Sequence, residues 1–360
     1  MESNFEECEN GKFRYLKKEG IFRYKDPSAP GGYRYEVTNT VLRELGEPDA
    51  DNLPSGLALY PDLVPGFIDD DMVLLPHVRV IYSEADHELW RRLFVKIEQT
   101  LADCVVKEVA DGYAWIKNLG GANEIPKLET MNKDIRAASG FELVQVMGLI
   151  PNDAFFKLLM EGKFPVTLSV RREEELSYTS FPDIFHDLAG HAPMFLNKEF
   201  CHFVRKIGDL GMRFSGEERL QGMVSKLYWY TIEFGLKAAE GPHFCRAYGA
   251  GIVSSPVETR DSVESVTAAC FDAAGNRVEG DRIIRRLPFN LERILLSHYD
   301  FAKPQELYFV IGDYRQLGEV FERDMEKYMR ELAARMGDYE IPQGTLLETD
   351  ILFPDYRAAG

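Results

Sequence analysis

The sequence predicts a mostly α-helical protein with small β elements. Apolar residues recur at every fourth position from Leu89 to Val105, which is close to the period of an amphipathic helix. The stretch EERLQGMVSKLYWYTIEFGLKAAEG predicts one long helix that ends at Gly241. Between the helical patterns, short runs such as FELVQVMG and FPVTLSVR have the character of strands.

The first 75 residues differ from the rest because turn-forming residues interrupt every pattern. DPSAPGGYRY, DADNLPSG and PDLVPG are rich in proline, glycine and aspartate. RYLKKEGIFRYKD suggests two short strands around Gly20. We interpret residues 1–75 as an N-terminal extension wrapped on the surface. One large domain is expected at 76–335, followed by a C-terminal tail at 336–360.

Several helix ends carry recognisable signals. Ser83 is a suitable N-cap, and Asp86 three residues later provides a weaker form of the capping box. A helix is predicted from Asn152 to Gly162, because glycine favours a helix C-terminus. Another helix is expected to begin at Asn197. LPFNLERILLSHYD and DYRQLGEVFERDMEKYMRELAARMG predict further helices.

Composition narrows the classes of function. The 360 residues carry a net charge of −17, which argues against a surface for nucleic acid or anionic membrane, since both need clustered Lys and Arg. The five cysteines form no CxxC pair, which indicates free thiols and a cytoplasmic location. Neither a secretory signal nor a membrane-spanning segment is expected.

The stretch SFPDIFHDLAGHAPMF holds two histidines, His186 and His191. Pro182 suits the first turn of a helix, and the residue before Pro193 avoids the helical region, so a short helix is expected to end near His191. In an ideal α-helix, a spacing of i, i+5 separates two side chains by about 140°. On these two residues alone, metal binding and an ordinary core position are equally supported.

A third ligand would favour the metal. Glu233 lies in the apolar and aromatic run KLYWYTIEFGLK, and a buried carboxylate must be paired or coordinated. The alternative is a hydrogen bond to a buried arginine or hydroxyl. Two histidines and one carboxylate without cysteine fit an open ferrous site better than a closed structural zinc site.

Three motifs in this order, PDIFHDLAGHAPMF, LYWYTIEFGL and AYGAGIVSSP, resemble the pterin-dependent aromatic amino acid hydroxylases. The bacterial-type phenylalanine hydroxylases are the most similar branch, and the resemblance runs from about Val80 to Phe321. It implies the family's catalytic-domain fold at 76–335. It also implies a monooxygenase that uses Fe(II), a tetrahydropterin such as tetrahydrobiopterin, and O2. His186, His191 and Glu233 then correspond to the iron ligands.

The resemblance also implies residues for an aromatic amino acid. Arg171 corresponds to the arginine that binds the substrate carboxylate, and a guanidinium fork suits that group. Thr179 and Asp183 correspond to residues that help to hold the carboxylate and the arginine. Ser254 corresponds to a serine near the polar end of the substrate. Trp229 is typical of the phenylalanine branch, so L-phenylalanine, converted to L-tyrosine, is the expected substrate.

A further set of positions corresponds to pterin contacts. Phe155 matches an aromatic residue that stacks on the ring, which suits a flat heterocycle. The full set is Gly148, Leu149, Ile150, Phe155, Asp187 and Tyr228.

Some features depart from the family. Asp187 stands where a glutamate is usual, Phe181 also replaces a glutamate, and residues 1–75 do not resemble the regulatory domain. Hydroxylation of Trp or Tyr, or of another ring position, therefore stays open. Two other classes are a zinc-dependent hydrolase with Asp187 as its base and a non-catalytic binder of amino acid or pterin.

Overall fold

The structure is a computed structural model that describes residues 5–8, 12–16, 18–46, 67–146, 148–176, 179, 181–241, 243–271, 277–301 and 303–353. Its strands are β1 (Phe5–Glu7), β2 (Lys12–Tyr15), β3 (Ile21–Lys25), β4 (Tyr33–Thr38), β5 (Val78–Ile81), β6 (Glu142–Val146), β7 (Lys163–Thr167), β8 (Gly235–Ala238), β9 (Cys245–Ala247), β10 (Thr267–Phe271), β11 (Arg277–Ile283), β12 (Arg285–Pro288) and β13 (Leu307–Ile311).

The α-helices are α1 (Asn39–Gly46), α3 (Glu84–Glu98), α4 (Leu101–Cys104), α5 (Lys107–Asn118), α6 (Leu128–Ser139), α7 (Asn152–Glu161), α8 (Lys198–Arg213), α9 (Glu218–Tyr228), α10 (Ala250–Val253), α11 (Pro256–Glu264), α12 (Leu291–Leu296), α13 (Arg315–Glu319) and α14 (Met325–Met336). The 3-10 segments are η3 (Pro30–Gly32), η5 (Glu173–Glu175), η7 (Ala192–Leu196) and η9 (Val320–Glu322), and the π segments are η6 (His186–His191) and η8 (Trp229–Glu233). The predicted mostly α-helical class with small β elements is confirmed.

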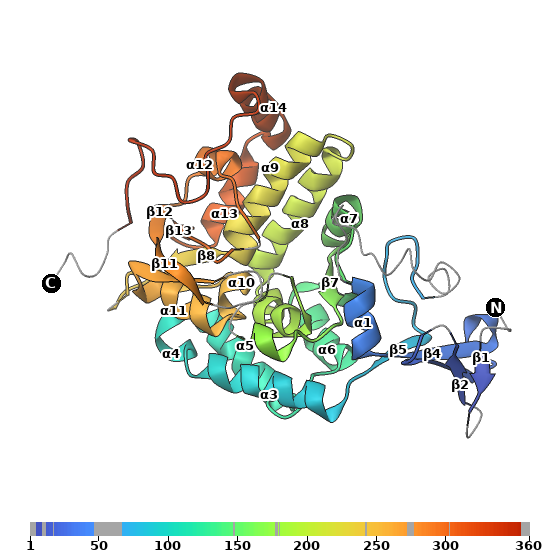
Figure 1. Cartoon of the computed structure of the whole chain (residues 1–360). Coiled ribbons are helices and arrows are strands. Elements are labelled where there is room, and N and C mark those ends of the chain that lie inside the picture. The colour runs from blue at the N-terminus through green and yellow to red at the C-terminus, as the bar shows by residue number, and fades with distance from the viewer. Residues whose placement is uncertain are drawn as a thin grey trace.

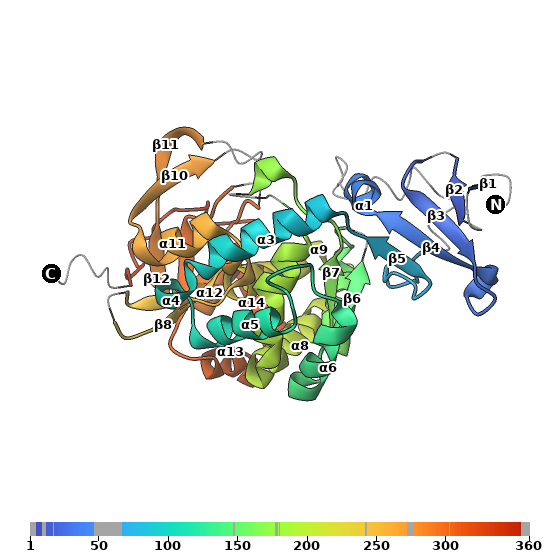
Figure 2. The same cartoon turned by 90° about the horizontal axis from the view of Figure 1, so that it is seen from below.

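The N-terminal residues build a five-stranded sheet beside the helical body (Figures 1 and 2). Strands β1 to β4 are antiparallel neighbours, and β5 joins β4 in parallel. The two strands predicted around Gly20 are present as β2 and β3. This sheet and α1 enclose their own core, which includes Ile21, Val37 and Phe67. The interpretation as a surface wrap is therefore wrong for the described residues, because apolar side chains on one sheet face need a core of their own.

The predicted helix start at Ser83 is confirmed. The helix does not continue through the apolar pattern to Val105. Ser83 and Asp86 form the reciprocal capping box at the start of α3. The helix ends at Glu98, and α4 is a separate turn. Val105 instead makes a bridge to Ala247, so its backbone is extended. The apolar spacing persists because these side chains face the same core.

The predicted strands at β6 and β7 form a parallel pair, with α7 as the connection. As expected, α7 begins at Asn152 and closes at Gly162, whose φ is 78°. Asn197 caps the start of α8, which confirms that prediction as well. Helices α7 and α8 approach closely, since a Cβ on Gly208 would lie 2.3 Å from a backbone atom of Met160.

The long helix predicted to end at Gly241 is wrong. The chain forms α9, then the π turn η8, and then strand β8. Strand β8 lies in a four-stranded sheet of order β12-β13-β8-β9, where β9 alone is antiparallel to its neighbour. The mostly apolar segment 232–236 suits a buried strand as well as a buried helix, so periodicity alone does not separate the two.

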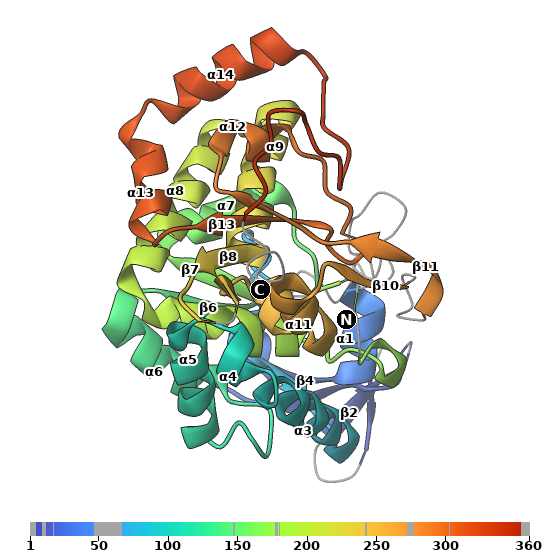
Figure 3. The same cartoon turned by 90° about the vertical axis from the view of Figure 1, so that its left-hand side faces the viewer.

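The C-terminal residues pack against this body. Helix α14 lies over α8 and α9, as Figure 3 shows. Beyond it, Ile341 is buried and its N–H donates to the carbonyl of Leu296. Arg293 and Asp350 form a buried ion pair with an N–O distance of 3.1 Å. None of the helices in the described part of the chain is long and apolar enough to cross a membrane.

Candidate active site

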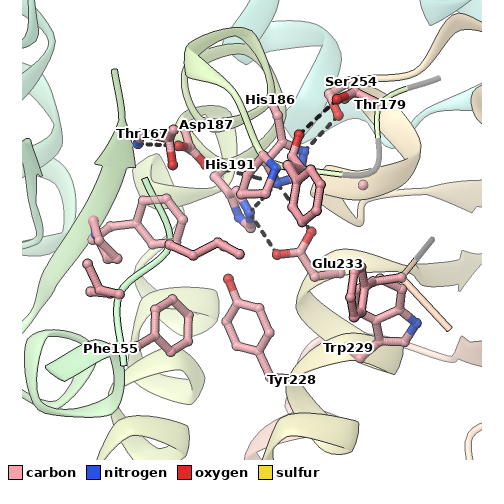
Figure 4. A pocket seen from close by; sticks show the side chains of 18 of the residues that line it. Phe155, Thr167, Thr179, His186, Asp187, His191, Tyr228, Trp229, Glu233 and Ser254 are labelled. Atoms are coloured by element: carbon pink, nitrogen blue, oxygen red, sulfur yellow. Dashed lines mark hydrogen bonds and ion pairs between the residues drawn. The ribbon is translucent and has the colours of Figure 1, made fainter. Parts of the chain in front are cut away.

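A cavity of about 460 Å³ opens between the two π turns, η6 and η8 (Figure 4). Its size is ordinary for a small-molecule site. All the predicted site residues except Asp183 line it, and Asp183 lines a smaller adjoining cavity. The structure therefore brings the predicted residues together at one place.

The two histidines lie at the first and last positions of η6. The N–H of Ala192 bonds to the carbonyl of Asp187, five residues earlier, which defines a π turn. In such a turn, residues at i and i+5 lie on the same face, so the angular objection raised by an α-helix disappears. Gly190 allows this turn to pack on α10, because a Cβ there would lie 2.8 Å from the carbonyl oxygen of Ala250.

Glu233 ends the second π turn. The N–H of Phe234 bonds to the carbonyl of Trp229, again five residues earlier. The motif AYGAGIVSSP supports this turn from the other side, since a Cβ on Gly249 would lie 2.3 Å from the carbonyl oxygen of Glu233. The glycine therefore serves a close backbone approach, and both turns rest on the same short segment.

Three candidate ligand groups converge in the cavity. The Nε2 atoms of His186 and His191 are 3.1 Å apart. The Glu233 carboxylate lies 3.0 Å from His191 Nε2 and 3.4 Å from His186 Nε2. Ligands held about 2.1 Å from one ion would be about 3.0 Å apart at right angles and about 3.4 Å apart in a tetrahedron. Two of the three separations match right angles, so the residues fit a metal with one open face.

Charge and hydrogen bonds prepare these groups for a cation. Burial lowers the pKa of His186 to about 4, so its imidazole is neutral near pH 7. The Ser254 hydroxyl donates to the Ala250 carbonyl and lies 2.9 Å from His186 Nδ1, which leaves that nitrogen as the donor and Nε2 with a free lone pair. Burial would raise the pKa of Glu233, but His191, His186 and Tyr228 lower it to about 2.

A second carboxylate, that of Asp187, competes for the role of third ligand. Its oxygen also lies within a group of ligand atoms formed with the two histidines. However, one oxygen accepts the N–H of Thr167 at 2.6 Å, and the other is 4.0 Å from His186 Nε2. Burial and the nearby charges of Asp183 and Glu233 raise the pKa of Asp187 well above its usual range. Glu233 is therefore the better ligand, because it is closer and is ionised.

The arginine predicted to bind the substrate is held by a buried acid. Arg171 Nε and Nη2 donate to the two oxygens of Asp183 at 2.9 and 2.8 Å. This contact occupies one edge of the guanidinium, and the end formed by Nη1 and Nη2 has the geometry to bind a second carboxylate. Asp183 also accepts the N–H of His186 at 2.9 Å, so one acid joins the arginine to the turn η6. Thr179 donates to the carbonyl of Phe181 and lines both cavities.

Trp229 lies on the opposite side of Glu233 from Phe155 in Figure 4. Its ring stacks on Tyr299 at 4.3 Å with an interplanar angle of 15°. Its indole nitrogen donates to the buried Gln305 at 2.9 Å. The Trp229 ring is therefore held by stacking on its face and by a hydrogen bond at its edge.

The predicted pterin contacts form another wall. Phe155 meets Tyr228 edge to face with the centroids 5.1 Å apart, and Phe155 is only partly buried. Burial and the charge of Glu233 raise the pKa of Tyr228, so its hydroxyl stays protonated. Gly148, whose φ is 74°, begins the run with Leu149 and Ile150 along the same cavity.

Sequence reasoning did not identify several residues at the cavity. Tyr299 and Phe301 line the cavity, and Gln305 does not line it but bonds to Trp229; all three follow α12 in sequence and reach the site only through the fold. Phe181 and Phe301 are partly exposed at the cavity, with their ring centroids 6.1 Å apart. The sequence singled out Phe181 only as a departure from the family. Phe301 gives no local signal beyond an apolar residue in a turn-rich segment, which is too common to assign a site.

Comparison with known proteins shows which family this chain is similar to. The family model for biopterin-dependent aromatic amino acid hydroxylases matches residues 74–341. The chain is 35% identical over 257 residues to a phenylalanine-4-hydroxylase of Pseudomonas aeruginosa, covering 71% of this chain and 88% of the relative. It is 32% identical over 290 residues to that of Ralstonia nicotianae, covering 80% and 81%. The iron- and phenylalanine-bound phenylalanine hydroxylase of Chromobacterium violaceum superposes with a TM-score of 0.66 at 30% identity, covering 79% and 96%.

Proposed function

This chain belongs to the biopterin-dependent aromatic amino acid hydroxylases, and we propose that it converts L-phenylalanine to L-tyrosine with Fe(II), a tetrahydropterin and O2. The observation that carries the proposal is the convergence of His186, His191 and Glu233 in one cavity. Arg171 and Trp229 line one side of this cavity, and Phe155 and Tyr228 line another. The similar proteins of Pseudomonas aeruginosa and Ralstonia nicotianae are phenylalanine-4-hydroxylases, which supports the choice of amino acid.

His186, His191 and Glu233 would hold the iron from one face. With O2 and the pterin as reductant, the metal centre supplies the chemistry that places an oxygen atom on the aromatic ring. Ser254 keeps the Nε2 lone pair of His186 directed at the metal. The buried surroundings of Glu233 strengthen its attraction to a cation, because the local dielectric is low.

The amino acid would lie between Arg171 and Trp229. The free end of the Arg171 guanidinium binds the substrate carboxylate, and Asp183 keeps that guanidinium oriented. Thr179 adds a hydroxyl at the same end. The Trp229 ring, stacked on Tyr299, borders the space for the phenyl group. This wall limits the size of the side chain that reaches the metal.

The pterin would lie against Phe155. Its ring offers an aromatic platform for a flat heterocycle, and Tyr228 presents its hydroxyl between that platform and the metal ligands. Gly148, Leu149 and Ile150 offer backbone groups along one edge. Asp187 would contact the pterin from a fixed position, since its carboxyl group is bound to Thr167.

The other classes have less support. A zinc-dependent hydrolase would need a general base at the metal, and the carboxyl group of Asp187 is already bound to the backbone of Thr167. A non-catalytic binder would have no use for an open metal face. Hydroxylation of Trp is opposed by the bulk of the Trp229–Tyr299 stack. The choice of Phe over Tyr rests on the similarity to the phenylalanine-4-hydroxylases of Pseudomonas aeruginosa and Ralstonia nicotianae.

We also propose the division of the chain into residues 1–75, a catalytic domain at 76–335 and a tail at 336–360. The family match at 74–341 supports the first boundary. A cytoplasmic location is proposed as well. All five cysteines are free thiols in the structure, which supports a reducing compartment.

A turnover assay tests the proposed function. The protein is loaded anaerobically with Fe(II), mixed with a tetrahydropterin and equal amounts of Phe, Tyr and Trp, and then exposed to air. Tyrosine that forms only with both iron and pterin, identified by chromatography and mass, supports the proposal. A different hydroxylated amino acid would change the substrate or the ring position. Tight zinc binding with no hydroxylated product would contradict the proposal.

A further inference from the structure

We propose that helix α1 of the N-terminal sheet unit is a brace that positions Arg171, through Arg43 and Asn39. The inference rests on the proposed function, because it takes Arg171 as the residue that binds the substrate carboxylate. It gives the N-terminal residues a role in substrate affinity, although neither Arg43 nor Asn39 lines the main cavity.

The segment 168–171 leads from β7 to Arg171 and belongs to no strand or helix. Its backbone groups would lack partners without outside help, and a buried backbone group needs one. Tyr82 donates to the Leu168 carbonyl at 2.8 Å, and the Ile184 N–H donates to the Ser169 carbonyl at 2.8 Å. The remaining contacts of this segment come mainly from α1.

Arg43 and Asn39 lie one helical turn apart on α1 and hold both main-chain groups of Val170. The Asn39 side-chain oxygen accepts the N–H of Val170 at 2.9 Å. Arg43 Nε donates to the Val170 carbonyl at 2.5 Å, and Nη2 donates to the Arg171 carbonyl at 2.9 Å. The main chain on either side of the Arg171 Cα is therefore tied to the N-terminal unit.

The brace is itself anchored. Asn39 is buried, and its amide donates to Asp86 Oδ1 at 2.5 Å. The other oxygen of Asp86 accepts from Ser83 in the capping box of α3. Arg43 lies 3.9 Å from the same carboxylate. Helix α1 is thus fixed to the start of α3, which belongs to the helical body.

Two different contacts then determine where the Arg171 guanidinium lies. Asp183 holds the Arg171 side chain and accepts its main-chain N–H at 2.9 Å, whereas Arg43 and Asn39 hold the main-chain groups on either side of the Arg171 Cα and at Val170. The proposed metal ligands stand on η6 and η8, and the side-chain hydrogen bonds of Asn39 and Arg43 reach neither turn. Loss of the brace is therefore expected to weaken carboxylate binding and to leave the metal site intact.

The test compares Arg43→Met and Arg43→Lys with the matched control Thr40→Ala, an exposed position on the same helix. Binding of two phenylalanine analogues to the Fe(II)-loaded full chain is measured by calorimetry under argon. 3-Phenylpropionate keeps the carboxylate, and 2-phenylethylamine lacks it. We expect Arg43→Met to lower the affinity for 3-phenylpropionate about tenfold. The effect of Arg43→Lys should be smaller, and Thr40→Ala should have no effect.

The other readouts separate positioning from general damage. Binding of 2-phenylethylamine and the KM for tetrahydropterin should not change, and in an Arg171→Gln background the Arg43→Met effect should vanish. If Arg43→Met lowered the affinity for both analogues equally, or for neither, the proposal that α1 positions Arg171 would be wrong. If Arg43→Met does not fold, Asn39→Ser removes the same anchor more gently. A wild-type chain that binds neither analogue would refute the proposed function, and the brace with it.

Discussion

Arg171 and Asp183 form a buried, two-point ion pair with N–O distances of 2.8 and 2.9 Å. Their side chains are almost fully enclosed, so neither charge is compensated by water. Asp183 also receives the N–H of His186, the first residue of η6. One carboxylate therefore sets both the direction of the proposed substrate arginine and the start of the turn that carries both histidines.

Substitution of Asp183 should damage stability and substrate binding together. Asp183→Asn keeps the size of the side chain but leaves the Arg171 charge unpaired, which we expect to cost about 3–5 kcal/mol of unfolding free energy. The double variant Asp183→Asn/Arg171→Gln should recover part of that stability and none of the affinity for phenylalanine. Denaturant unfolding and the KM for phenylalanine measure the two effects. Full affinity in the double variant would contradict the assignment of Arg171.

Removal of the Glu233 charge should weaken metal binding without unfolding the chain. Glu233→Gln retains the shape, but an amide is a poorer ligand for a divalent ion than a carboxylate. In the wild type, Fe(II) or Co(II) should raise the melting temperature, since a ligand that binds only the folded state stabilises it. The variant should show a much smaller rise and no coupled turnover.

Asp187→Asn is the matched comparison for Glu233→Gln, because both changes replace a buried carboxyl group by an amide. In the wild type, the Asp187 carboxyl group accepts the N–H of Thr167, so we do not expect it to bind the metal. If Asp187→Asn abolished the metal-dependent rise and Glu233→Gln kept it, the third ligand would be Asp187. Visible absorption of the cobalt-loaded proteins gives a second measure of the ligand set that does not depend on turnover.

The hydroxyl of Ser254 should increase the affinity for the metal, because it orients the imidazole of His186. Ser254→Ala removes the acceptor for Nδ1–H, so the imidazole loses its preferred tautomer and orientation. Loss of such an outer partner typically costs about 10–100-fold in metal affinity or activity. Metal affinity is measured by competition with a chelator. The neighbouring Ser255→Ala is the control, since Ser255 caps α11 and its loss should cost about 1 kcal/mol of stability without changing metal affinity.

The sequence predicted the parts of this site that depend on residue type and order. The two histidines and Glu233 were singled out from their motifs, the proposed pterin contacts come from the family resemblance, and the structure places all of these residues around one cavity. The two π turns were not predicted, because helical patterns assume 3.6 residues per turn and a single i→i+5 bond leaves no trace in the pattern. The spacing of His186 and His191 therefore gave a weaker signal than their arrangement deserved.

Long-range contacts were the other part that sequence reasoning missed. The brace from α1 depends on Asn39 and Arg43, a polar pair in a segment first interpreted as a surface wrap. The contact of Gln305 with Trp229 depends on the return of the chain after α12. Neither pair is close in sequence to its partner, and one sequence alone does not reveal which distant polar residues meet.

Gln305 should control the selectivity for phenylalanine, because it fixes the position of Trp229. It is fully buried, its side-chain oxygen accepts the indole N–H of Trp229, and its amide donates to the Leu307 carbonyl at 2.9 Å. Gln305→Leu leaves both partners unsatisfied, which we expect to cost about 1–3 kcal/mol of unfolding free energy. The Trp229 ring would then keep its ring contacts with Tyr299 and Phe234 but would lose the hydrogen bond that fixes its edge. Turnover of larger aromatic amino acids should rise relative to phenylalanine, because the wall no longer has a fixed position.

The ratio of kcat/KM for phenylalanine to that for tryptophan measures this loss of selectivity. Gln305→Glu is the control, because it keeps an acceptor for the indole N–H of Trp229 and should preserve the preference for phenylalanine. A fall of the ratio in Gln305→Leu alone would assign the effect to the lost hydrogen bond, since both variants alter the same buried position. An unchanged ratio in folded Gln305→Leu would instead show that the ring contacts with Tyr299 and Phe234 are sufficient to position Trp229.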